Sequence, residues 1–404
     1  MSAPKSASDH PHIALLVETS LGSGRDILRG IAAYARQQRN WSLFHEPRSL
    51  EESAPGWLAQ WSGDGIIARI QNRQLADAVK ATGIPVVDVL GIESGTGFPL
   101  VHVDDKSIVG EAVEHLHERG FRKFGFFGIA GENWSDRRRE AMREFVAAKG
   151  GSLHIFEASR TELHEMAWEQ REDRLAQWIE QLPRPAGVMV CSDQLGSDFM
   201  EACRRATVSV PDEIAVVGVD NDEPLCEVCQ PPLSSVCPDH MAVGFKAASV
   251  LDSMLHGGPT PPARTLIPAR KVVTRRSSDV LAIADANVAK ALRVIRDHGC
   301  EDINVDQIVR HSGLSRSVLQ RRFRQVLGTT IHAEILNCRL KQACHLLAET
   351  DLSLMEIAER AGFKHQEYMG AVFKSKLSKT PGQFRRQNKL ESKALGEISK
   401  AFAD

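Results

Sequence analysis

The sequence predicts an α/β region built as two lobes around parallel β-sheets, followed by an all-α region that contains two helix-turn-helix motifs. Residues 12–277 alternate short β-rich runs with helical segments, as parallel sheets covered by helices require. Several runs, such as AVVGV, are apolar throughout, which is typical of strands buried on both faces. A region of roughly 265 residues is large for one hydrophobic core, which favours two lobes.

The elements of this region follow one another along the chain. The strand candidates are HIALLVE from His12, DGIIARI from Asp64, PVVDVL from Pro85, FRKFGFFGI from Phe121, GVMVCSD from Gly187 and IAVVGVD from Ile214. The helices expected between them include Arg25 to Gln38, Ser107 to Glu118, Ser135 to Lys149 and Gln194 to Ala206. The Gly- and Pro-rich segment from His256 to Pro268 predicts an exposed loop before a last strand, and residues 278–285 form the predicted connector.

The last quarter of the chain contains two copies of one pattern. VDQIVRHSGLSRSVLQRRF begins at Val305 and LMEIAERAGFKHQEYMGAVF begins at Leu354. In each copy an apolar pair precedes a glycine that can adopt a left-handed turn, Gly313 or Gly362, and a phenylalanine closes the second helix. The alternative is a pair of ordinary amphipathic surface helices. Two copies with matching internal spacing favour helix-turn-helix motifs, and therefore DNA binding.

Each motif has an apolar face and a polar face in its second helix. If Ser315 caps the first of these helices, Leu319, Phe323, Val326 and Leu327 share the buried face. The opposite face is rich in groups that recognise base edges, and its residues are Arg316, Ser317, Gln320, Arg321 and Arg324. In the second motif, Ser353 and Glu356 predict a capping box, and the apolar positions are Met369, Val372, Phe373 and Leu377. The exposed positions there are His365, Gln366, Glu367 and Gly370, with Lys374 near phosphate.

This all-α region resembles the DNA-binding unit of the AraC/XylS family of transcription regulators, in which a long helix joins two helix-turn-helix motifs. The joining helix would run from Ile331 to Glu349, and the family's closing pattern stands as Thr380, Pro381, Phe384 and Arg385. The sequence departs from the family at Ser378-Lys379, where a glycine is usual. We expect the domain to span residues 286–390, with a tail at 391–404.

The charges divide between the two regions. The whole chain has 50 Lys and Arg against 52 Asp and Glu, but residues 281–404 have 20 basic against 14 acidic side chains, while residues 1–280 have 30 against 38. Phosphate binding favours the basic excess, because each neutralised phosphate releases counterions. The acidic region must therefore have another task.

Local strings throughout residues 12–277 resemble the effector domain of LacI/GalR regulators and the periplasmic sugar-binding proteins. They are DGIIA at Asp64, VDD at Val103, FGFFG at Phe124, Arg138 in an R-x-x-A pattern, a strand ending at Asp193 and VGVDN ending at Asn221. The resemblance implies a periplasmic-binding-protein-like fold of two Rossmann-like lobes with a sugar between them. LacI regulators place their DNA-binding motif in front of this domain, whereas here the order is reversed.

The reversed order, together with the strings GRDILRGIAAYAR and WSDRRR, resembles the family of bacterial xylose-operon regulators. This resemblance implies D-xylose as the effector, a homodimer bound to promoter DNA, and activation through RNA polymerase. A pyranose needs hydrogen-bonding side chains and an aromatic platform. Asp193, Asp220 and Asn221 follow predicted parallel strands, where ligands of open α/β folds bind. The family match adds Arg138 and Trp134, and the loop after the first strand adds Arg25 and Asp26.

Each of these residues also has a structural interpretation, since a strand-end Asp can cap a helix, an Arg can form a surface pair and a Trp can belong to the core. The alternative functions are those of a nucleotide-binding enzyme fused to a DNA anchor and of an effector-independent DNA-binding protein. The LGSG string at Leu21 lacks the third glycine of a dinucleotide loop, so we expect no enzyme and no cofactor.

Cys226, Cys229 and Cys237 lack the spacing of a zinc site. No apolar stretch is long enough to span a membrane and no export signal is evident, so we expect a cytoplasmic protein with thiol cysteines.

Overall fold

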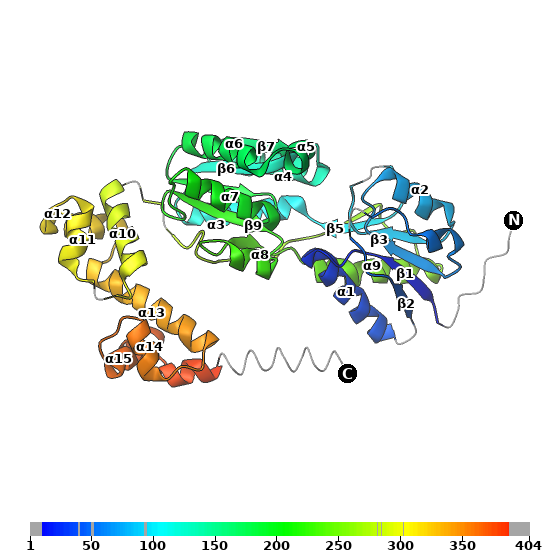
Figure 1. Cartoon of the computed structure of the whole chain (residues 1–404). Coiled ribbons are helices and arrows are strands. Elements are labelled where there is room, and N and C mark those ends of the chain that lie inside the picture. The colour runs from blue at the N-terminus through cyan, green and yellow to red at the C-terminus, as the bar shows by residue number, and fades with distance from the viewer. Residues whose placement is uncertain are drawn as a thin grey trace. The chain divides into compact units, whose positions relative to one another are not determined.

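The computed structural model divides into two compact units between Ala282 and Ile283 (Figure 1). It describes residues 10–38, 41–49, 52–92, 95–280, 282–283, 285–301 and 303–387. The predicted tail at 391–404 lies outside the described residues.

The first unit contains two six-stranded sheets, each of which forms one lobe. The strands of the first sheet, in sheet order, are β11 (Arg264–Ile267), β5 (Leu100–Val103), β4 (Val86–Asp88), β3 (Gly65–Ala68), β1 (His12–Leu16) and β2 (Ser42–His45), all parallel to their neighbours. Its helices are α1 (Gly22–Gln38), η1 (Gly56–Gln60), α2 (Arg73–Ala81) and α9 (His240–Leu255). Helices α1 and α9 pack closely, and Gly30 and Gly244 allow this because a Cβ at either would meet backbone 2.0 Å away.

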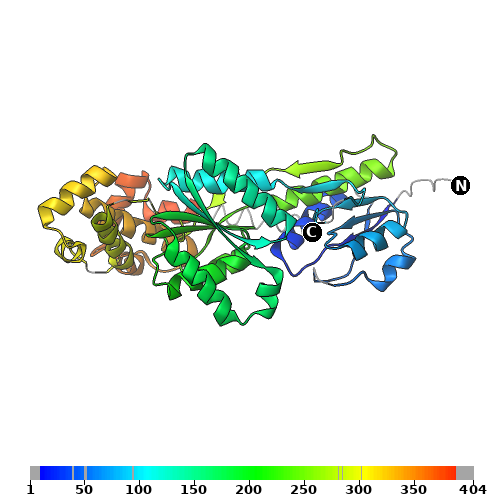
Figure 2. The same ribbon diagram turned by 90° about the horizontal axis from the view of Figure 1, so that it is seen from above.

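The second sheet has the order β12 (Val272–Val273), β10 (Ser234–Val236), β9 (Ile214–Val219), β8 (Ala186–Val190), β6 (Lys123–Ala130) and β7 (Ser152–Ser159). Only β12 is antiparallel to its neighbour. Helices lie on either side of the sheet, as Figure 2 shows. They are α3 (Asp105–Glu118), α4 (Asn133–Ala148), α5 (Arg160–Glu165), α6 (Trp168–Gln181), α7 (Asp193–Arg205) and α8 (Glu223–Val228). Strands β8 and β9 are buried along their whole length, as their apolar sequences predict.

The chain passes between the lobes three times, after β5, after β10 and after β11. The sequence predicted a loop from His256 to Pro268, and the second half of this prediction is wrong because it contains a strand. Strand β11 occupies Arg264–Ile267, because the residues between the flanking prolines pair with β5 at the edge of the first sheet.

The other predicted strands and helices are confirmed within a few residues. The prediction missed β2, β5, β7 and β10, which lack a continuous apolar run. Strand β5, for example, includes His102, and β7 has the sequence SLHIFEAS, whose side chains are mostly half-buried. Tertiary pairing decides their conformation more than local propensity does.

The second unit is helical. Its helices are α10 (Ala286–His298), α11 (Val305–Ser312), α12 (Arg316–Leu327), α13 (Ile331–Glu349), α14 (Leu354–Arg360) and α15 (Gln366–Leu377), followed by helical residues 381–387. Helix α13 has the predicted bounds. One apolar cluster joins α10, α11 and α12 to the start of α13, and another joins α14 and α15 to its end.

The turns and caps of this unit follow the sequence except at Ser315, and one residue of α12, Val326, departs from its predicted burial. Gly313 and Gly362 adopt left-handed φ angles of 71° and 80°, and Ser353 and Glu356 form the capping box. Ser378 also adopts a left-handed φ of 55°. It belongs to the Ser378-Lys379 pair, where the AraC/XylS pattern usually has a glycine. Ser315 is the residue before α12 but makes no side-chain cap bond. Val326 is 44% exposed, so its placement in the buried face was wrong, whereas the next residue, Leu327, packs against the apolar cluster as predicted.

Candidate functional site

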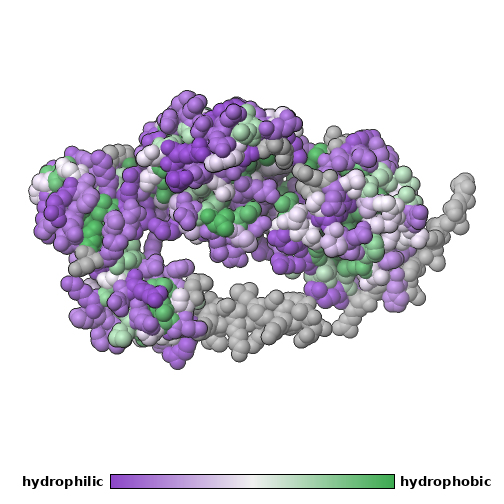
Figure 3. Space-filling model, viewed as in Figure 1, coloured by the Kyte–Doolittle hydropathy of each residue, from purple (hydrophilic) through white to green (hydrophobic). Residues whose placement is uncertain are grey.

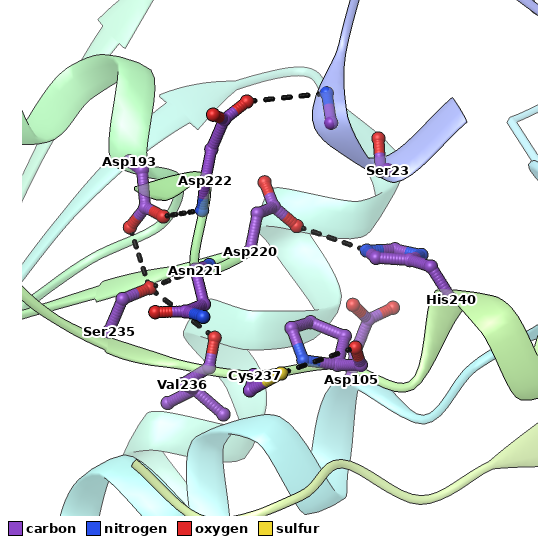
Figure 4. A network of polar contacts seen from close by, with 12 residues as sticks. Ser23, Asp105, Asp193, Asp220, Asn221, Asp222, Ser235, Val236, Cys237 and His240 are labelled. Atoms are coloured by element: carbon purple, nitrogen blue, oxygen red, sulfur yellow. Dashed lines mark hydrogen bonds and ion pairs between the residues drawn. The ribbon is translucent and has the colours of Figure 1, made fainter. Parts of the chain in front are cut away.

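The carboxyl ends of β8, β9 and β10 meet in a network of polar contacts centred on Asp193 (Figure 4). This carboxylate is 1% exposed. It accepts hydrogen bonds from the Ser235 hydroxyl over 2.7 Å, from the Asp222 backbone N–H over 2.9 Å and from the Cys226 thiol over 3.4 Å. Burial, together with the nearby charge of Asp220, raises its pKa to about 7.

Asp193 fixes the loop that follows β9. Two successive non-glycine residues of this loop, Asp220 and Asn221, have positive φ angles of 108° and 51°. Such a backbone persists only where the surroundings impose it, and it occurs often at binding sites. The Asn221 N–H donates to Ser235 Oγ over 3.0 Å. Gly218 completes the arrangement, because a Cβ there would lie 2.1 Å from the Asp193 carboxylate.

The same loop contacts the first lobe at two points. Asp220 Oδ1 lies 3.4 Å from His240 Nε2, at the start of α9, and Asp222 Oδ2 accepts from the Gly22 N–H, at the start of α1, over 3.2 Å (Figure 4). The loop after β9 is therefore in direct contact with both lobes.

Arg138 and Trp134 lie on α4, beside the same edge of the second sheet. The Arg138 guanidinium is buried beneath the Trp134 ring, 5.0 Å from its centroid, and it donates to Asp105 Oδ1 over 2.9 Å and to the Cys191 carbonyl. Burial opposes the charge of Arg138, but Asp105 and Asp220 more than compensate and raise its pKa above the ordinary value. Trp134 is half-buried and packs against the core, so it retains an exposed part.

Arg25 and Asp26 do not join this network. Arg25 is exposed and its Nη1 donates to the carbonyls of Thr19 and Ser20, within the β1–α1 loop. Asp26 pairs with Arg29 on the same helix over 2.6 Å. These contacts of Arg25 and Asp26 are local to the β1–α1 loop and the beginning of α1.

Sequence reasoning missed several buried polar residues at these strand ends. Asp105 binds both Arg137 and Arg138, His240 contacts Asp220, and Glu18 pairs with Arg69 at the ends of β1 and β3. A signal was available for Glu18, since it is a carboxylate that directly follows an apolar strand. No sequence signal points to His240, because only the fold brings it to Asp220.

The cysteine group at 226–237 makes ordinary thiol contacts. Cys226 donates to Asp193, and Cys229 donates to the Leu225 carbonyl over 3.3 Å. Within the described residues no group of three or more His, Cys, Asp or Glu side chains is arranged to hold a metal ion.

The candidate DNA-contacting residues lie where the helical periodicity predicts. Arg316, Ser317, Gln320, Arg321 and Arg324 are all exposed on α12, while Leu319 and Phe323 are fully buried beneath them. His365, Gln366, Glu367 and Lys374 are exposed on and before α15. Gly370 leaves open space, since a Cβ there would meet no atom within 4 Å. In the space-filling view, apolar residues form only small scattered areas on the visible surface (Figure 3).

Three matches to known families cover most of the chain. Residues 12–103 match the XylR N-terminal domain, residues 113–278 match the periplasmic binding protein-like domain, and residues 308–387 match a helix-turn-helix domain. The xylose operon regulatory protein of Escherichia coli strain K12 is 32% identical to this chain over 386 residues, which cover 93% of this chain and 97% of that protein. The chain belongs to the xylose operon regulatory protein family.

Other relatives agree with this family. The xylose operon regulatory protein of Haemophilus influenzae is 31% identical, with coverage of 92% of this chain and 97% of that protein. The structure of the xylose-binding transcription activator xylR matches with a TM-score of 0.79 and 30% identity, over 95% of this chain and 99% of that one. A complex of the regulator CelR with cellobiose matches 68% of this chain with a TM-score of 0.52 and 20% identity, which shows the two-lobed fold alone.

The family resolves the choice between functional classes. The protein is a sugar-responsive, DNA-binding transcription regulator and not an enzyme. Among the described residues no helix combines the length and hydropathy that crossing a membrane requires.

Proposed function

We propose that this protein binds D-xylose between its two lobes and, when bound, activates transcription of xylose-catabolic genes. The observation that carries the proposal is the strained Asp220–Asn221 loop, which is supported by a buried carboxylate and touches both lobes. The Escherichia coli and Haemophilus influenzae relatives are xylose operon regulatory proteins, and one matching structure is that of a xylose-binding transcription activator. These names support the choice of sugar and the direction of regulation.

The proposed sugar-contacting residues are Asp193, Asn221, Arg138, Asp220 and Trp134 from the second lobe, with Arg25 and Asp26 from the first. Asn221 and Asp220 have amide and carboxylate groups that suit sugar hydroxyls, and the half-buried Trp134 ring suits the apolar face of a pyranose. Asp193 also acts beneath them, because its two oxygens hold the loop.

In the second unit, the proposal assigns base recognition to Arg316, Ser317, Gln320, Arg321 and Arg324 on α12. The corresponding residues around α15 are His365, Gln366, Glu367 and Gly370, with Lys374 on phosphate. The two recognition helices would occupy successive major-groove segments of one promoter site.

The proposal also includes the assembly and its setting. It places residues 12–277 in the effector domain, 278–285 in the connector and 286–390 in the DNA-binding domain. A homodimer in the cytoplasm would engage paired promoter sites and recruit RNA polymerase. The relatives' coverage of almost the whole chain supports the order of the domains, and the dimer and RNA polymerase are implied by the sequence resemblance.

Isothermal titration calorimetry of the full-length protein against a panel of pentoses and hexoses tests the sugar assignment. D-xylose should bind saturably and more tightly than the other sugars. Asn221→Ala should weaken binding by about 1–3 kcal/mol, since it removes a polar partner of a buried hydroxyl. Glu223→Gln, at an exposed position two residues away, is the matched control. Equal binding of all sugars, or none, would refute the assignment.

A further inference from the structure

Arg275 joins the candidate sugar site to the segment that leaves the second sheet. This residue follows β12, and its side chain is half-buried. Its Nη1 donates to Asn221 Oδ1 over 2.9 Å and to the Leu233 carbonyl over 3.1 Å.

The bond to Asn221 determines which end of that side chain faces a ligand. A guanidinium has only donors, so Asn221 must turn its carbonyl oxygen toward Arg275. The amide nitrogen, with two N–H donors, then points away and can donate to sugar hydroxyls. Without Arg275, the carboxamide could turn either of its ends toward the sugar.

The backbone of Arg275 is fixed to the adjacent strand β10. The Arg275 N–H donates to Ser234 Oγ over 2.8 Å, and Ser234 Oγ donates to the Arg275 carbonyl over 2.9 Å. Two residues later, Ser277 is fully buried and bonds to the backbone of Val216 through both its hydroxyl and its carbonyl. A shift at Arg275 therefore acts on a hydrogen-bonded segment and not on a loose loop.

Further contacts between this segment and the second lobe follow at Ser278 and at Ala282. Ser278 is fully buried, its hydroxyl bonds to Ser234 and His115, and its carbonyl accepts from Arg119 Nε over 2.9 Å. The Ala282 N–H donates to the Arg119 carbonyl over 2.8 Å. The second unit begins at the next residue. A continuous series of bonds thus links Asn221 to the last residue of the first unit.

We propose that Arg275 is a positioning residue with two effects: it orients the Asn221 amide toward the sugar, and it transmits occupancy of the site to residues 275–282, which lead into the DNA-binding unit. This inference rests on the proposed function, in which Asn221 contacts the sugar. A sugar that tightens the Asn221–Arg275 contact favours one arrangement of this segment, and linkage then makes operator DNA and sugar affect each other's affinity equally.

The test uses full-length Arg275→Met, with Arg276→Met as the matched control, because Arg276 is the exposed neighbour with the same charge. Two quantities are measured: D-xylose affinity by calorimetry, and operator affinity with and without saturating D-xylose. We expect Arg275→Met to weaken D-xylose binding about tenfold. In Arg275→Met, the ratio of operator affinity with saturating D-xylose to operator affinity without sugar should fall toward one. The operator affinity without sugar should stay at the parent value. Arg276→Met should change neither quantity.

A double-mutant cycle separates positioning from general damage. If Arg275 acts through Asn221, adding Arg275→Met to Asn221→Ala should weaken sugar binding no further. Arg275→Lys keeps the charge but lacks the planar guanidinium and has a shorter reach, and it replaces Arg275→Met if the methionine variant fails to fold. It should show the same pattern with a smaller loss of sugar affinity.

The outcomes distinguish the two proposals. Parent-like sugar affinity in the Arg275 variants, or additive effects in the cycle, would overturn the positioning role. Weakened binding with an unchanged operator ratio at saturation would overturn the transmitting role. Failure of the parent protein to bind D-xylose would instead refute the proposed function, and this inference with it.

Discussion

The Asp220–Asp222 loop and the exposed face of α12 both present polar side chains, but they are held by different means. In the loop, polar groups bind one another, and the buried Asp193 fixes the backbone. On α12, the polar side chains are exposed and the helix is positioned by Leu319 and Phe323 on its other face. Stability and ligand contact are therefore carried by the same residues at the candidate sugar site, whereas on α12 they are carried by different ones.

The largest effect that this comparison predicts is at Arg138. Arg138→Met should lower the free energy of unfolding of the first unit by about 3 kcal/mol, because it leaves the buried Asp105 carboxylate with Arg137 alone. All six tryptophans precede residue 179, so tryptophan fluorescence in urea reports the first unit only. Arg143→Met, an exposed change on the same helix, should cost less than about 0.5 kcal/mol. Equal costs for the two variants would remove the distinction.

The second prediction concerns pH. Since Asp193 has a folded-state pKa near 7, above its ordinary value of 3.8, its contribution to stability is fully present below the ordinary value. As pH rises through about 7 that contribution is lost, and the free energy of unfolding falls by up to about a few kcal/mol. Urea unfolding from pH 5 to pH 8 should therefore show a steeper loss in the parent than in Asp193→Asn. The slope is the measured quantity, because the amide also alters the hydrogen bonds. Parallel slopes would mean that Asp193 is ionised throughout.

The third prediction tests whether recognition on α12 is separable from stability. Arg321→Ala should leave the free energy of unfolding of the chain, followed by circular dichroism of its helices, within about 0.5 kcal/mol of the parent. It should also reduce discrimination at particular base pairs by about 1–3 kcal/mol. Lys374→Ala should instead weaken all sequences alike and reduce the salt dependence of binding. A uniform loss for Arg321→Ala would reassign it to phosphate.

The smallest effect is expected at Gly370. A Cβ at this position meets no atom within 4 Å, so Gly370→Ala should stabilise α15 by up to about 1 kcal/mol. If Gly370 faces DNA closely, the same change should weaken operator binding. Thermal unfolding and operator titration of this variant measure the two effects. A gain in stability with unchanged DNA affinity would place Gly370 outside the DNA-contacting surface.

The difference between the loop and the helix face also explains which site residues could be predicted from the sequence. The faces of α12 and α15 follow from helical spacing, so the exposed positions were found from the sequence alone, and Val326 is the one apolar position of α12 that was predicted to be buried and is exposed. The candidate sugar site depends on side chains from separate strands. Asp193 and Asn221 were recognised as strand-end residues, but His240, Asp105 and Arg275 join them only through the fold. Local patterns cannot report such long-range pairings.

The three passages of the chain between the lobes also set an order of events during synthesis. Strand β11 completes the first sheet, and α9 completes the packing of that lobe. Both leave the ribosome after all five parallel strands of the second sheet. The nascent first lobe must therefore wait with an open edge beside β5, and an unpaired strand edge invites wrong partners. The helical unit is continuous in sequence, so it can fold as soon as it emerges. We expect translation pauses or truncations between residues 103 and 264 to be the most prone to aggregation, which a ribosome-stalled series of chains would reveal.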